Sequence, residues 1–174
     1  MAKKLRFKPW LSSRTLSPRM LKRVLNCFPP LIFQRIKILE IGPEFQSCRV
    51  RIARSLLTRN LHGTTFGGTL FSAADSPLPV LLWQIFAHRG IQVESWLQSG
   101  QIRYEKPAAS DLFLEFRLSD EEIEAAATEL QERGRFRRSH ELTATDEAGV
   151  VYARICVEAY VRLSREENGG LSAF

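Results

Sequence analysis

Residues 60–75 read NLHGTTFGGTLFSAAD and run directly into a strongly apolar segment, LPVLLWQIF. The whole stretch 67–88 is apolar on nearly all sides, which predicts one long helix buried in the core. Pro77 and Pro79 interrupt it, and each proline removes a backbone donor and clashes with the preceding turn. We therefore expect a single buried helix over 67–88 that is kinked between residues 73 and 79.

The segments on both sides of this helix have the alternation or the β-branched content of strands. A helix from Ser17 to the Pro29-Pro30 pair precedes them, and the polar, Ala- and Glu-rich segment 120–133 predicts an exposed helix. Because an apolar helix flanked by strands is buried only if the strands wrap it, we predict an α+β fold with a curled antiparallel sheet. The expected strands are 35–41, 48–53, 93–104, 112–118, 135–146 and 150–163.

The chain has 174 residues, the length of one domain, and its charge is uneven. All ten basic residues up to Lys37 precede the first acid, Glu40, whereas the remainder carries 15 basic and 19 acidic residues. We predict a basic N-terminal arm (1–16), one domain (17–163) and a C-terminal tail (164–174). Three interpretations of the arm stay open: a solvated tail, a contact with anionic lipid, RNA or cofactor phosphates, or an organelle-targeting peptide.

Several classes of protein are disfavoured by the sequence. The sequence contains no run of 18 apolar residues, so no membrane span is predicted. It also contains no motif for nucleic-acid recognition and no spacing of metal ligands. Cys27, Cys48 and Cys156 lie far apart, which argues against a disulfide scaffold and for a reducing compartment. We expect a cytoplasmic protein without metal or nucleic-acid partner.

Asp75 is the first candidate for chemistry. An ionised carboxylate beside so apolar a segment is costly unless it has a partner or a use. As a carboxylate it could activate a water or attack a carbonyl directly. The alternative is a kink residue whose side chain bonds to Ser72, Ser76 or nearby backbone. Gly67 and Gly68 would let backbone N–H groups at the helix N-terminus approach a developing oxyanion.

The same residues carry a family resemblance. An Asn-x-x-Gly turn at Asn60 and Gly63, a Gly-Gly pair and an Asp seven residues after the second glycine resemble the signature of hotdog-fold acyl-CoA thioesterases. The phrases TFGGTLFSAAD and, over 102–107, IRYEKP are similar to a branch related to the phenylacetyl-CoA thioesterases. The resemblance implies a hotdog fold, a curled antiparallel sheet wrapped around a long central helix.

The resemblance also implies roles for individual residues. Asp75 takes the place of the catalytic acid, and Asn60 becomes a candidate for binding the attacking water or the carbonyl, although a plain turn residue is the alternative. Many relatives have a His immediately before the Gly-Gly pair, where this chain has Phe66, so polarisation of the carbonyl would fall to the backbone alone. The remaining candidates for substrate binding are Gly63, Gly67, Gly68 and Phe66, with Phe71 for the acyl chain and Arg103 and Lys106 for the phosphates of coenzyme A.

Three hypotheses of function follow. The first is an Asp-dependent hydrolase of acyl-CoA or another acyl thioester, with coenzyme A only as part of the substrate and no other cofactor. The second is a hotdog protein that binds an acyl-CoA or fatty acid without turnover, which Phe66 favours. The third is an interaction module whose basic arm contacts a membrane or nucleic acid. Because hotdog relatives pair sheet edges, we also expect a homodimer or a dimer of dimers.

Overall fold

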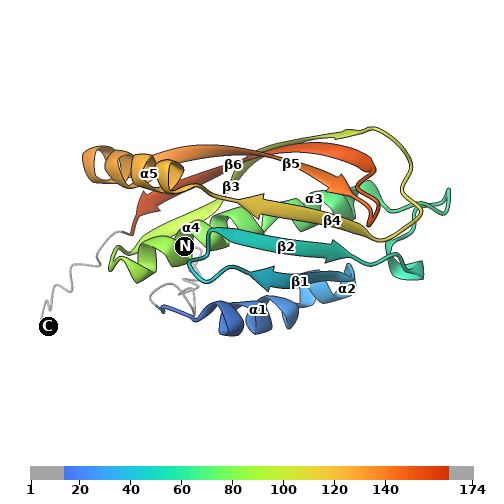
Figure 1. The fold of residues 1–174 in the computed structure, drawn as a ribbon, viewed down its shortest axis with the longest axis horizontal. Helices are drawn as coiled ribbons and strands as arrows, with labels where there is room; N and C mark the ends of the chain where they lie inside the picture. Colours follow the sequence, from blue (N-terminus) through green and yellow to red (C-terminus); the bar gives the residue numbers. More distant parts are fainter. Residues whose placement is uncertain (1–13, 165–174) are drawn as a thin grey trace, which may run out of the picture.

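The computed structural model describes residues 14–164, which form one sheet and the helices packed on it. Six strands lie in the order β1-β2-β4-β5-β6-β3, and each neighbouring pair is antiparallel. They are β1 (Ile36–Ile41), β2 (Ser47–Ile52), β3 (Val93–Tyr104), β4 (Leu112–Arg117), β5 (Arg135–Thr145) and β6 (Val151–Leu163). The sheet curls around a long central helix (Figure 1), which confirms the predicted α+β hotdog architecture.

The central helix consists of α3 (Gly67–Asp75) and α4 (Pro77–His88), which meet at Ser76. The break falls within the predicted interval. Pro77 and Pro79 have no N–H, so the carbonyls of Ala73 and Asp75 lose their helical partners. Leu78, Leu81, Leu82 and Phe86 on α4 are almost completely buried, as expected for a core helix. By length and composition this helix could cross a membrane, but the sheet encloses it instead.

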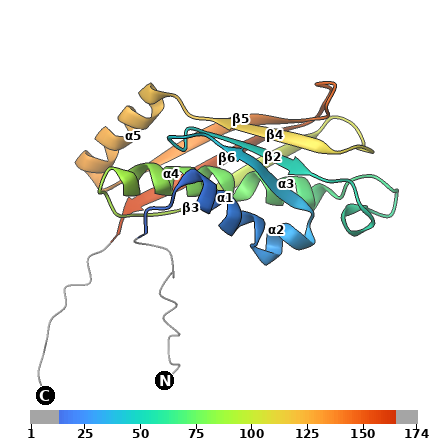
Figure 2. The same cartoon turned by 60° about the horizontal axis from the view of Figure 1, so that its bottom comes forward.

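The two helices before the sheet depart from the prediction. Ser17 accepts a hydrogen bond from the Met20 amide and Pro18 begins α1, as expected, but α1 ends at Asn26. The Pro29-Pro30 pair then opens a second short helix, α2 (Pro29–Phe33), instead of only ending the first. Proline suits the first turn of a helix because those N–H groups have no intrahelical partner. Figure 2 shows α1 and α2 side by side below the sheet.

The helix α1 covers one edge of the sheet. The Asn26 side chain donates to the Ile38 carbonyl (2.9 Å) and accepts from the Ile38 amide (2.8 Å), so it satisfies outward-facing groups of β1. Lys22 donates to the Leu39 carbonyl next to it. At the other edge, β3 pairs with β6 on one side, and no strand of the described region pairs with its other side. The sheet therefore has one covered edge and one open edge.

The helix α5 (Asp120–Arg133) has the predicted bounds; it begins with a capping box of Ser119 and Glu122 and ends at Gly134 in the left-handed conformation. It buries one stripe, Ile123, Ala126 and Leu130, and leaves its other faces exposed.

Of the predicted arm and tail, residues 1–13 and 165–174 lie outside the described residues. Residues 14–16 lie against α4. Buried Gln84 accepts from the Leu16 amide (2.8 Å) and donates to the Arg14 carbonyl (3.2 Å). The end of the predicted arm is thus bonded to the core helix.

Candidate functional site

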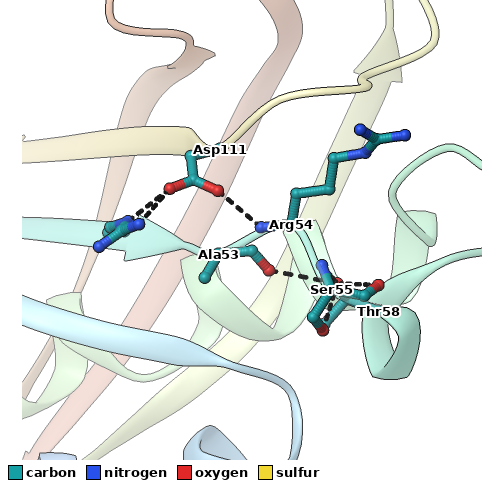
Figure 3. A network of polar contacts seen from close by, with 6 residues as sticks. Ala53, Arg54, Ser55, Thr58 and Asp111 are labelled. Atoms are coloured by element: carbon teal, nitrogen blue, oxygen red, sulfur yellow. Dashed lines mark hydrogen bonds and ion pairs between the residues drawn. The ribbon is translucent and has the colours of Figure 1, made fainter.

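The loop between β2 and α3 is held at its base by a network of polar contacts (Figure 3). Asp111 accepts from the Arg54 amide (2.8 Å) and from Arg51 Nε (2.7 Å). Burial by itself would raise the pKa of Asp111, but the Arg54 amide bond and the bond and charge of Arg51 outweigh it and lower the pKa. In the short helix η1 (Leu56–Thr58), the Thr58 hydroxyl donates to the Ala53 carbonyl (3.2 Å). The network fixes where the loop leaves the sheet.

Asn60 shapes the tip of this loop. Its Oδ1 accepts from the amides of His62 (2.9 Å) and Thr64 (3.1 Å), and its Nδ2 donates to the Thr64 hydroxyl (2.8 Å). Gly63 has a φ of 78°, a conformation that favours glycine. The side chain of Asn60 is thus largely engaged within the turn, and one Nδ2 proton is left for another partner.

The N-terminus of α3 follows the loop and has no side-chain cap, because its N-cap residue is Phe66. The first amides of a helix have no intrahelical acceptor, so those of Gly67 and Gly68 are free to bind an anionic oxygen. Two aromatic rings lie close to these glycines. A Cβ on Gly67 would lie 2.5 Å from the Tyr104 hydroxyl, and one on Gly68 would lie 2.5 Å from the Phe66 ring. With the two rings where they lie, neither position has room for a side chain.

A pocket of about 700 Å³ opens at this helix terminus. It brings together three predicted site residues, Asn60, Gly67 and Lys106. The Lys106 ammonium lies 5.7 Å from the centre of the Tyr152 ring, at a cation–π distance. The remaining lining residues are His62, Thr64, Thr65, Leu70, Tyr104, Glu105, Pro107, Ala108 and Tyr152.

Tyr104 is a pocket residue that was not among the predicted site residues. Its hydroxyl lies over Gly67, and burial raises the pKa of its phenol. It therefore stays protonated at neutral pH and can donate a hydrogen bond beside the helix terminus. Its position inside the IRYEKP phrase, at the end of a strand, was the available signal.

Asp75 lies outside this pocket. Gly67 contacts Tyr104 and Phe71 packs on Gly100, so the face of α3 with residues 67, 71 and 75 is turned toward β3. Asp75 is exposed, and within residues 14–164 its side chain has no hydrogen-bond or ion-pair partner. The Ser76 hydroxyl, one of the expected partners, is buried without a hydrogen bond.

Burial of part of the Asp75 carboxyl raises its pKa above the usual value for aspartate. A carboxylate with a raised pKa is a stronger base than an ordinary aspartate. Asp75 is eight residues beyond Gly67, which at 1.5 Å per residue is about 12 Å along the helix axis. One chain therefore cannot bring its own Asp75 to a carbonyl bound at its own α3 N-terminus.

Other predicted residues lie apart from the pocket. Arg103 lines a separate cavity of about 710 Å³ over β3 to β6, and its Nε lies 3.6 Å from Glu105. The Phe71 ring is packed on Gly100 of the edge strand and is not aimed into the pocket. Across residues 14–164, no three His, Cys, Asp or Glu side chains are grouped in a way that could hold a metal ion.

Comparison with known proteins gives a consistent picture. Residues 41–157 match the model of the family YiiD_C, whose description is "Putative thioesterase (yiiD_Cterm)". No curated protein matches the chain.

Solved structures share the fold. A protein of Pseudomonas aeruginosa described as a probable thioesterase has a TM-score of 0.77 and 24% identity, over 87% of this chain and 99% of its own. Thioesterase HI1161 of Haemophilus influenzae has a TM-score of 0.64 and 12% identity, over 91% and 99%. The PaaI protein of the E. coli phenylacetic acid degradation operon has a TM-score of 0.56 and 12% identity, over 82% and 89%.

Proposed function

Because this chain belongs to the YiiD_C family, a family of thioesterases, we propose that it hydrolyses acyl-CoA thioesters at a site shared by two subunits. The observation that carries the proposal is the uncapped N-terminus of α3, whose first amides are those of Gly67, which lines the pocket, and of Gly68, the next residue along the helix. These amides would bind the oxyanion that forms when a thioester carbonyl is attacked. The Tyr104 hydroxyl beside Gly67 would add a third donor.

Asp75 of the other subunit would supply the base. Its carboxylate takes a proton from water while the water oxygen attacks the carbonyl carbon. The tetrahedral oxyanion then collapses, the carbon–sulfur bond breaks, and the thiolate of coenzyme A takes up a proton. The products are a carboxylic acid and coenzyme A. Direct attack by Asp75 would instead give an anhydride that water opens to the same products.

The distance along α3 supports a site between subunits. A separation of about 12 Å between Gly67 and Asp75 exceeds the reach of one carboxylate, whereas a second chain at the open edge could bring its Asp75 to this pocket. Asp75 is directed toward β3, the strand that is unpaired on its outer side in the described region. We propose a homodimer formed through β3, with a dimer of dimers as a further assembly.

Lys106 is our candidate for the phosphates of coenzyme A, since it lines the pocket and carries a positive charge near its mouth. The three cysteines are free thiols, and burial raises the pKa of Cys48 to about 12, so this thiol is inert. Free cysteines are typical of a reducing compartment, and we propose the cytoplasm.

A panel of acyl-CoA esters tests the proposed function. Straight-chain esters of increasing length and an aromatic ester such as phenylacetyl-CoA are incubated with the full chain, and a thiol reagent measures released coenzyme A. We expect release that depends on acyl structure. Saturable binding of acyl-CoA without release would favour the alternative, a binding protein, because the Phe66 ring lies against Gly68 where a polarising side chain could have been. Neither release nor binding would contradict both.

Asn60→Ala is expected to lower kcat by about tenfold. This effect is smaller than the loss of the proposed base would be, because Asn60 positions the loop and does not react. The substitution removes the acceptor for the His62 and Thr64 amides. Asn60→Asp is the matched control because it keeps that acceptor while it replaces the amide donor by a negative charge. Recovery of kcat in Asn60→Asp would identify a positioning role, whereas two equally impaired variants would show that the neutral amide itself is needed.

A further inference from the structure

The turn after α1 and the short helix α2 together form an apolar corner, Cys27–Phe33, with the sequence CFPPLIF. Six of its seven residues are exposed, and only Leu31 is buried. The Phe33 side chain is 72% exposed, and Phe28 and Ile32 are each nearly half exposed. Contiguous exposed apolar side chains of this size mark an interaction surface in soluble proteins.

The corner is held rigidly. Leu31 inserts into the core together with Leu21 and Leu25 of α1. The Phe28 carbonyl accepts from the amides of Leu31 (3.0 Å) and Ile32 (3.1 Å). The Pro29-Pro30 pair fixes two successive φ angles. Phe28, Ile32 and Phe33 are therefore presented to solvent at little further cost in conformational entropy.

Cations surround this apolar corner. Arg19 and Arg23 lie four residues apart on the exposed face of α1, together with Met20, and exposed Arg35 follows α2. Residues 14–39 contain six basic residues and no acid. The next acids, Glu40 and Glu44, lie toward the N-terminal end of α1 and not at the corner, because α1 runs antiparallel to β1 with Asn26 at Ile38 and Lys22 at Leu39, and Glu44 lines a pocket together with Ser17 and Pro18.

We propose that the apolar corner and its flanking cations bind the surface of a bilayer that contains anionic lipid. Aromatic and aliphatic side chains enter the boundary between headgroups and acyl chains, while arginines at the rim remain with the lipid phosphates. A nucleic acid could stack bases on the Phe rings, but it would leave the aliphatic side chains of Ile32 and Met20 without a favourable contact. A second copy docked on the same face would bring two sets of like charges together.

The contact is shallow and reversible. α1 has nine residues and α2 has five, so both helices are too short to span a bilayer and would lie on its surface. Since the electrostatic part acts only within about a Debye length, binding falls as salt is added. The loop between β2 and α3, which leads to the pocket, begins next to the apolar corner, because the Ala53 amide donates to the Arg35 carbonyl (3.0 Å). Docking would bring that loop near the lipid.

Co-sedimentation of the full chain with vesicles tests the proposal. We expect binding to vesicles of phosphatidylcholine with about one third phosphatidylglycerol, and at least about tenfold weaker binding to phosphatidylcholine alone. Phe28→Ser with Phe33→Ser is expected to weaken binding to the anionic vesicles by about tenfold. Arg19→Gln with Arg23→Gln should weaken it and flatten its dependence on salt. Circular dichroism checks that each variant is folded.

The matched control is Val150→Ser with Leu163→Ser, two exposed apolar residues at the end of the β5–β6 hairpin and of β6. It should bind as the wild type does. Failure of the wild-type protein to bind the anionic vesicles would overturn the proposal. So would unchanged binding of the double Phe variant, which would assign the contact to cations alone. A double Phe variant that loses self-association, measured by sedimentation, would overturn it in favour of an interface between copies.

Discussion

Asp75→Asn is expected to lower kcat on the best acyl-CoA substrate by about 100-fold or more, the usual loss when a general base is removed. Asparagine keeps the shape of the side chain but has no basicity. The carboxylate has no partner in the described region of the chain, so its removal breaks no ion pair or hydrogen bond there. Assays of released coenzyme A at saturating substrate measure the effect.

The pH profile gives an independent check. Burial raises the pKa of Asp75, and catalysis needs the ionised form, so wild-type kcat should fall as pH drops through this raised pKa. The residual activity of Asp75→Asn should lack that limb. A raised pKa also means that the ionised carboxylate slightly destabilises the fold at neutral pH, and this penalty disappears as the group is protonated in acid. The variant should thus melt at or slightly above the wild-type temperature at pH 7.

Glu132→Gln provides the control, since it neutralises an exposed carboxylate on α5, far along the chain from the site. It should leave kcat unchanged. A folded Asp75→Asn protein with wild-type kcat would show that Asp75 is not the base.

Lysines in place of Ser99 and Gln101 are expected to convert a dimer into monomers and to abolish hydrolysis. Both residues are exposed on β3, the edge strand. In a two-fold pairing of this edge, the two lysines of each chain face those of the other, and edge lysines are a common means of preventing such pairing. Analytical ultracentrifugation at micromolar concentration measures the change.

Thr128→Lys with Ala148→Lys adds the same charge at exposed positions on α5 and the β5–β6 turn, and should remain dimeric and active. A wild-type protein that sediments as a monomer would contradict the expected assembly. An edge variant that becomes monomeric but stays fully active would contradict a shared site.

A mixed dimer tests the shared site directly. Gly67→Val places a side chain against the Tyr104 hydroxyl and should be inactive, like Asp75→Asn. A dimer of one chain of each kind has one site with both substitutions and one with neither, so a pure mixed dimer should have about half of the wild-type activity, and random mixing of equal amounts should restore about a quarter. If the site lay within one chain, every site would carry a substitution and mixing would restore nothing.

The periodic elements of the fold were predictable from sequence because their signals are local. The kink at Ser76 follows from two prolines, and α5 follows from its polar, Ala- and Glu-rich composition. The second helix at Pro29 was missed because proline pairs both end and begin helices.

The site was only partly predictable. The motif identified Asn60, Gly67 and Lys106, which the fold brings to one pocket. The spacing of residues along the sequence does not show where their side chains point. Tyr104 lies over Gly67 only because β3 runs beside α3, a contact between segments far apart in sequence. For the same reason the different surroundings of Arg103 and Lys106, three residues apart, appear only in three dimensions.

The Asn26 side chain on β1 limits how far the protein can assemble. A sheet with two bare edges could add copies at both ends and grow without limit. Here the amide and carbonyl of Ile38 are already occupied by Asn26, which leaves β3 as the edge open to a neighbour in the described region. In the proposed assembly, edge pairing through β3 would therefore stop after one addition: each chain would have a valence of one, and the product would be a closed pair instead of a fibre, so that a dimer of dimers would need a different surface.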